Sequence, residues 1–122
     1  MISIDYPFCK EEINFLRVVS MANKDEIIIH VDSEIQELIP KFLENRRQDV
    51  EIILEALKQQ DVETILTLGH NMKGQGTAYG FDTISDIGAG IEKAALSKDS
   101  EGMKKFAAEL LDYLQRVKII YG

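Results

Sequence analysis

A histidine and a lysine three residues apart are the side chains of this sequence with the clearest capacity for chemistry. They are His70 and Lys73, within the stretch LGHNMKGQGTAYGF at 68–81. Neutral imidazole is plentiful near pH 7, and its unprotonated nitrogen is a nucleophile. A lysine ammonium group beside it would offset negative charge placed on the ring. The pair therefore favours an imidazole that accepts a phosphoryl group presented by another protein.

The apolar pattern around His70 predicts a helix over 62–79, and successive residues of a helix are rotated by about 100°. Lys73, Gly74 and Thr77 then lie within about 60° of His70. The apolar residues of this helix lie together on the opposite side: Ile65, Leu68, Met72 and Tyr79. His70 is thus predicted on the face that points away from the core.

The glycines of this helix divide into groups with different expected roles. Gly74 lies on the face of His70, where a glycine costs up to ~1 kcal/mol relative to alanine, so we expect a partner to approach closely there. Gly69 and Gly76 are rotated toward the core and suit close helix packing. Gly80 is expected to end the helix.

No catalytic apparatus accompanies the histidine. The sequence has no glycine-rich nucleotide loop and no second catalytic group near 70, so the partner must supply the chemistry. We expect a phosphocarrier rather than an enzyme, with no cofactor. We also expect no metal site, because His30 and His70 lack a metal-binding spacing and Cys9 is the only cysteine.

The composition is that of one soluble domain with a protein partner. The chain has 122 residues and a net charge of −7, which argues against nucleic acid or an anionic membrane as partner. The lone thiol of Cys9 fits a reducing compartment. No secretory signal and no apolar run of ~18 residues is visible. We expect a cytoplasmic monomer.

Four helices are predicted between residues 34 and 120. The first begins near residue 38, because Pro40 belongs to a first turn. Asp61 is the predicted N-cap of the second, and Asp82 of a third that ends near Leu96. A fourth begins at 99 or 100, with a buried stripe that continues to Val117. The predicted fold is all-α, an antiparallel four-helix bundle over residues 32–122.

Residues 1–31 are predicted to be an N-terminal extension that packs on this bundle. Lys10 to Met21 has the pattern of a short amphipathic helix. The β-branched segment EIIIHV at 26–31 favours an extended strand, although no partner strand is evident.

The spacing around the histidine resembles the histidine phosphotransfer (HPt) domain of bacterial multistep phosphorelays. The pattern is His70, Lys73-Gly74 and Gly80, supported by LIPKFLENRRQDV, DVETI and the segment IEKAA at 91–95. The similarity covers residues 32–121. It implies a four-helix bundle in which His70 exchanges a phosphoryl group with response-regulator receiver domains or takes it from a histidine kinase. Lys73 would steady the phosphate, and Gly74 would permit docking.

The resemblance extends to the histidine-bearing domain of chemotaxis-type kinases. There a glutamate on the next helix orients the histidine, and Glu92 holds that position here, 22 residues after His70. Such a carboxylate would hold Nδ1–H and leave Nε2 as the nucleophile. Glu92 is equally compatible with a simple helix-pairing charge. Many family members carry a small hydroxyl residue or glycine at the position of Gln75, which is a departure from the pattern.

Three further residues near His70 are predicted to contact a partner. Asn71, Gln75 and Thr77 are candidates for the docking surface, with Thr77 also explicable as an ordinary surface residue.

The first alternative function is the phosphoacceptor domain of a histidine kinase, phosphorylated directly by its ATP-bound catalytic domain. The second is a helical adaptor that binds partners without phosphotransfer.

Overall fold

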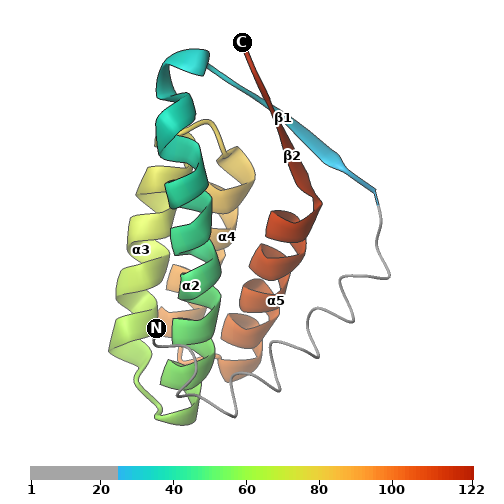
Figure 1. The fold of residues 1–122 in the computed structure, drawn as a ribbon. Helices are drawn as coiled ribbons and strands as arrows, with labels where there is room; N and C mark the ends of the chain where they lie inside the picture. Colours follow the sequence, from blue (N-terminus) through green and yellow to red (C-terminus); the bar gives the residue numbers. More distant parts are fainter. Residues whose placement is uncertain (1–24) are drawn as a thin grey trace.

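A four-helix bundle with a small parallel sheet beside it makes up the part of the chain that the computed structural model describes, residues 25–122 (Figure 1). The elements in chain order are β1 (Ile27–Val31), the 3-10 helix η2 (Ser33–Leu38), α2 (Ile39–Lys58), α3 (Val62–Ala78), α4 (Asp82–Leu96), α5 (Ser100–Arg116) and β2 (Val117–Tyr121). The predicted helical bundle is confirmed. Cys9 and the helix predicted for Lys10 to Met21 lie outside the described residues.

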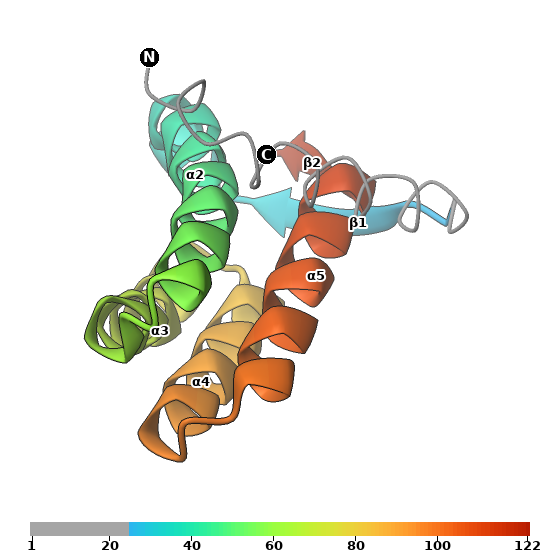
Figure 2. The ribbon, with the colours of Figure 1, turned by 90° about the horizontal axis from the view of Figure 1, so that it is seen from below.

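Each helix packs on two others around one core. Seen from below, α3 lies beside α2 and α4, and α5 lies beside the same two helices (Figure 2). The fully buried side chains come from all four helices and include Ile53, Ile65, Met72, Ile91 and Leu110. Within residues 25–122, no helix combines the length and hydropathy that crossing a membrane requires.

Three of the predicted helix starts agree with the structure and one does not. Pro40 lies in the first turn of α2. Asp61 caps α3 by accepting a hydrogen bond from the Thr64 amide, and Asp99 caps α5 in the same way. Asp82, predicted as the N-cap of α4, is instead its first residue, after Phe81. The buried ring of Phe81 holds this position in the core, and its carbonyl accepts from the third and fourth amides of α4.

The three helix–helix connections share one turn geometry. The second residue after each helix has a positive φ, of 59° at Gln60, 90° at Gly80 and 54° at Lys98. In each case the next amide bonds back to the helix, as when Phe81 N donates to Gly76 O at 2.7 Å. This is the Schellman arrangement, which favours glycine at the left-handed position. Gly80 therefore ends α3 as predicted.

The extended segment before the bundle has a partner after all. β1 pairs in parallel with β2, in a register that places Ile27 opposite Val117 and Val31 opposite Tyr121. The prediction that the last helix includes Val117 is wrong, because α5 ends at Arg116. The run VKIIY is rich in β-branched residues, which favour a strand once a partner exists. That partner lies about 90 residues earlier, beyond the reach of a local pattern.

α3 and α4 approach each other through glycines. A Cβ built on Gly69 would lie 2.7 Å from the Glu92 amide nitrogen, and one on Gly76 only 2.5 Å from the Ser85 nitrogen. Gly88 plays the same role from α4, since its Cβ would lie 2.5 Å from the Lys73 nitrogen. Backbone lies against backbone here, and no side chain could be accommodated between them. The inward roles predicted for Gly69 and Gly76 agree with this packing.

A buried ion pair on α2 faces α3. Arg46 Nε lies 2.8 Å from Asp49 Oδ2, and both side chains are about one-tenth exposed. Burial raises the pKa of the Asp49 carboxyl to about 6, and the neighbouring charge of Arg46 offsets only part of this.

The glycine packing predicts opposite effects of one substitution at two positions of α3. Gly69→Ala should lower the free energy of unfolding by about 1–3 kcal/mol, because its methyl group meets the backbone of α4. Gly74→Ala should raise it by up to ~1 kcal/mol, because nothing lies within 4 Å of its Cβ. Urea unfolding followed by circular dichroism measures both. A Gly69→Ala variant as stable as Gly74→Ala would contradict this packing.

The raised pKa of Asp49 predicts a pH-dependent stability. The folded chain keeps a proton on Asp49 up to a pH of about 6, whereas the ordinary value is 3.8. This contribution to stability is complete below the ordinary pKa and is lost as the pH rises through about 6. Asp49→Asn should therefore gain on the order of 2–3 kcal/mol relative to wild type between about pH 4 and pH 7. Urea unfolding across this range tests it, and a constant difference would contradict it.

Candidate functional site

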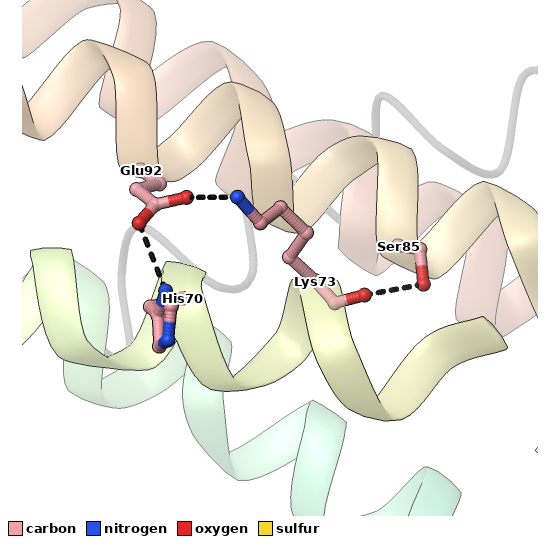
Figure 3. Close-up of polar contacts among 4 residues, drawn as sticks. All are labelled: His70, Lys73, Ser85 and Glu92. Carbon is pink, nitrogen blue, oxygen red and sulfur yellow. Dashed lines mark hydrogen bonds and ion pairs between the residues drawn. The ribbon is translucent and has the colours of Figure 1, made fainter. Parts of the chain in front are cut away.

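His70 projects from α3 into solvent, as the helical rotation predicts. Its side chain is 67% exposed. The ring does not stand alone, because its Nδ1 lies 3.0 Å from Oε2 of Glu92 on α4. The second ring nitrogen lies on the side of the ring away from Glu92 (Figure 3). The bare backbone contact between Gly69 and Glu92 brings the two helices close enough for this bond.

Glu92 joins the histidine to the lysine. Its other carboxylate oxygen, Oε1, lies 2.9 Å from Lys73 Nζ (Figure 3). The Glu92 side chain is only 19% exposed, whereas that of Lys73 is half exposed. One carboxylate on α4 thus contacts both functional groups that the sequence places one turn apart on α3.

The charge state of Glu92 determines which nitrogen of His70 carries hydrogen. The bond from Lys73, and after it the bond from His70, hold the pKa of the Glu92 carboxyl below its usual value. An ionised carboxylate only accepts hydrogen bonds. The proton of the 3.0 Å contact must therefore belong to His70 Nδ1. In a neutral ring this leaves a lone pair on Nε2, the nitrogen on the open side.

Gly74 and Asn71 leave the surface beside His70 open. Both are exposed, and a Cβ added at Gly74 would meet nothing within 4 Å. The backbone of α3 is therefore accessible to a large partner one turn beyond His70. The docking role of these two residues stays a prediction.

Gln75 and Thr77 are exposed but are bound to neighbouring helices. Gln75 Oε1 accepts a hydrogen bond from Arg46 Nη1 of α2. The Thr77 hydroxyl lies 2.8 Å from the Ser85 hydroxyl of α4. Neither side chain is brought to the ring of His70. Both flank the candidate site, and their part in docking stays a prediction.

Ser85 is a residue of this region that the sequence analysis did not single out. Its hydroxyl donates to the Lys73 carbonyl oxygen at 2.7 Å (Figure 3). Its spacing of three and seven residues from Gly88 and Glu92 places all three on one helical face. This spacing does not indicate which backbone lies beside that face, so the sequence alone does not identify Ser85.

The described residues offer no metal centre. Among residues 25–122, no group of three or more His, Cys, Asp or Glu side chains is placed to hold a metal ion. The carboxylate of Glu92 is engaged by two nitrogen donors instead.

A comparison with protein families identifies the chain. The model of the Hpt domain matches residues 37–119, from the end of η2 through α2, α3, α4 and α5 into β2. The chain belongs to the Hpt domain family. Hpt domains are phosphocarriers rather than catalysts, and they interact with receiver domains and kinases in phosphorelays. Comparisons with curated proteins and with solved structures found no match.

The geometry of this Hpt domain predicts which neighbour controls Glu92. Lys73→Met should raise the pKa of the Glu92 carboxyl toward its ordinary value, and by more than His70→Gln does, because the lysine is the stronger influence. An NMR titration of the side-chain carboxyl carbon measures both shifts. Lys118→Met, on the exposed face of β2, is the matched control and should leave Glu92 unchanged.

Asp61 provides an internal reference in the same titration. Its pKa is lowered by hydrogen bonds from Thr64 at the start of α3, remote from Lys73 in sequence. It should titrate identically in all variants. A Glu92 pKa that is unaffected by Lys73→Met would contradict the ion pair.

Proposed function

We propose that His70 is the phosphoacceptor of this Hpt domain and exchanges a phosphoryl group with the aspartate of a receiver domain. The observation that carries the proposal is the exposed ring whose Nδ1–H is held by an ionised Glu92, itself bound to Lys73. This arrangement leaves Nε2 as the available nucleophile on the solvent side. Membership of the family supports a phosphoacceptor role in general.

The proposed transfer step is a substitution at phosphorus. The lone pair of His70 Nε2 attacks the phosphorus atom of an aspartyl phosphate on the receiver. A P–N bond forms as the P–O bond to the aspartate breaks, and the aspartate leaves as a carboxylate. The Nδ1 proton stays in its bond to Glu92, whose negative charge stabilises the positive charge that develops on the ring. Transfer to a receiver is the same step in reverse.

Lys73 and Gly74 have separate roles in this proposal. The ammonium group of Lys73, one turn from His70 and half exposed, is available to neutralise the phosphoryl oxygens. It exchanges its bond to Glu92 for a bond to the phosphoryl group, and Glu92 then serves His70 alone. Gly74 leaves the space that the rim of the receiver's active site needs.

A second candidate function follows from the same hydrogen bond. The contact between Glu92 and His70 is the feature that the sequence shares with chemotaxis-type kinases. It favours direct phosphorylation of His70 by the ATP-bound catalytic domain of a histidine kinase. The γ-phosphoryl group would then pass to Nε2 with ADP as the leaving group. A purely adaptor role has no such observation in its favour.

The cellular setting is also part of the proposal. We place the protein in the cytoplasm as a monomer, with proteins as its partners. The net charge of −7 supports a protein partner over nucleic acid. The division into an N-terminal extension over 1–31 and a bundle over 32–122 stays a prediction, and β1 attaches the end of that extension to β2.

Phosphotransfer to a set of variants tests the proposal. Phosphorylated receiver domains, and separately histidine kinases with ATP, are incubated with the wild-type chain, and acid-labile phosphate is measured. His70→Gln should abolish labelling, whereas His30→Gln, which changes the exposed histidine of β1, should leave it unchanged. Lys73→Met should slow transfer on the order of tenfold, as expected for the loss of a charge-assisted bond. Lys118→Met should not.

The donor that labels His70 distinguishes the two functions. Labelling by receivers supports the phosphorelay role, and labelling by a kinase with ATP in the absence of any receiver supports the kinase-domain role. No labelling by any donor, or equal labelling of His70→Gln, would overturn both phosphotransfer functions. The helical adaptor would then be the remaining hypothesis.

A further inference from the structure

Ser85 on α4 contacts the backbone of α3 at the residue that carries the ammonium group of the site. Its hydroxyl donates to the Lys73 carbonyl at 2.7 Å and accepts from the Thr77 amide at 2.6 Å. The Thr77 hydroxyl, 2.8 Å away, is its third partner. One donor and two acceptor positions are all that a hydroxyl has. Ser85 is 8% exposed, so its full hydrogen-bonding capacity is used in a buried place.

The Ser85 hydroxyl binds two backbone groups of the same turn of α3. In an α-helix the carbonyl of one residue faces the amide four residues later. Lys73 and Thr77 stand in this relation, and Ser85 Oγ binds both the carbonyl of Lys73 and the amide of Thr77. Ser85 therefore ties the turn of α3 that begins at Lys73 to α4.

Lys73 meets α4 at three points. Its amide nitrogen lies against the bare Cα of Gly88, where a Cβ would be only 2.5 Å away. Its carbonyl is bound by Ser85, and its ammonium group is bound by Glu92. Gly76 makes room for the serine, since a Cβ there would lie 2.6 Å from Ser85 Oγ. Both the backbone and the charged end of Lys73 are thus held by one helix.

We propose that Ser85 is a positioning residue of the phosphoacceptor site, which fixes the backbone of Lys73 so that its ammonium group stands beside Glu92 and His70. The proposal rests on the proposed function, and it assigns to Ser85 no contact with the phosphoryl group. A lysine side chain has four flexible bonds and considerable rotamer freedom. A fixed backbone origin reduces the number of positions that the ammonium group samples, and so pre-organises it for the incoming phosphoryl group.

Removal of the hydroxyl should release this constraint without opening a large cavity. In Ser85→Ala the Lys73 carbonyl and the Thr77 amide lose their shared partner on α4. The backbone of Lys73 is then tied less firmly to α4, and the ammonium group is held less firmly beside Glu92. The effect of Lys73 on its neighbours should therefore weaken although Lys73 itself is present.

A double-mutant cycle between Ser85→Ala and Lys73→Met tests this weakening. The first readout is the pKa of the Glu92 carboxyl, measured by NMR titration, which requires no phosphotransfer. Lys73→Met should shift this pKa by less than about half as much in the Ser85→Ala background as in wild type. A merely structural role for Ser85 predicts the same shift in both backgrounds.

The second readout is the rate at which His70 is phosphorylated by phosphoramidate, a small donor that needs no docking surface. The P–N bond of the donor breaks, ammonia leaves with its electron pair, and the phosphorus atom bonds to Nε2. Ser85→Ala should slow this reaction by about threefold or more, and the added loss of Lys73 should then cost much less than it does in wild type.

Ser97→Ala, at the C-cap of the same helix, is the matched control. The Ser97 hydroxyl also bonds to backbone carbonyls, those of Lys93 at 3.1 Å and Ala94 at 3.3 Å, but within α4 itself. Its removal should change neither readout. Thr77→Val, which removes one of the three partners of Ser85, should change both in the same direction and by less. Circular dichroism establishes that each variant is folded, and Thr77→Val carries the test if Ser85→Ala is not.

The outcomes separate this proposal from the proposed function. If Ser85→Ala and Lys73→Met have additive effects on both the Glu92 pKa and the phosphorylation rate, and His70 is phosphorylated normally, the role of Ser85 is overturned. The proposed phosphoacceptor role of His70 then stands. If the two substitutions have coupled effects on the Glu92 pKa but no donor phosphorylates His70, the positioning of Lys73 by Ser85 stands. The proposed phosphoacceptor role of His70 is then overturned.

Discussion

Close contact between α3 and α4 is the constraint on which the rest of the site depends. Gly69 and Gly76 on one helix and Gly88 on the other leave no room for a Cβ between the two backbones. Only at this separation does a glutamate on α4 reach both a histidine and a lysine on α3. Three glycines thus determine the relative positions of the side chains of His70, Lys73 and Glu92.

The same contact explains how the imidazole of His70 can be exposed and yet ordered. His70 is largely in solvent, where a side chain normally samples several rotamers. Its bond to Glu92 restricts the ring, and Glu92 is in turn restricted by Lys73 and by its partial burial. Rigidity therefore comes from α4, whereas access comes from the open surface around Gly74. A phosphocarrier requires both, because its partner must find the imidazole in one orientation.

Much of this arrangement was predictable from the sequence, because it depends on helical periodicity. The exposure of His70, the inward rotation of Gly69 and Gly76 and the end of α3 at Gly80 all follow from residue spacing and from the conformational range of glycine. The contact of Glu92 with His70 was indicated by resemblance alone, since spacing within one helix says nothing about its distance from the next.

Two features could not be predicted because they depend on partners remote in sequence. The strand nature of 117–121 is determined by pairing with 27–31, whereas its apolar residues continue the pattern of the preceding helix. The role of Ser85 depends on its contact with the backbone of α3, which the sequence of α4 does not indicate. The N-cap of α4 differs by one residue because the burial of Phe81, a tertiary effect, outweighs the capping preference of Asp82.

The parallel direction of β1 and β2 has a mechanical consequence. The chain enters β1 at one end of the ribbon, beside Arg116, and leaves β2 at the opposite end, beside Val31, whose carbonyl bonds to the Gly122 amide. Tension between the chain before β1 and the chain after β2 therefore pulls the two strands along their length. Their hydrogen bonds are loaded together in shear rather than broken one after another, as they would be in an antiparallel hairpin pulled open at its ends. All four helices of the bundle, including α3 with His70, lie between these strands in sequence, so the ribbon bears the load before the bundle does.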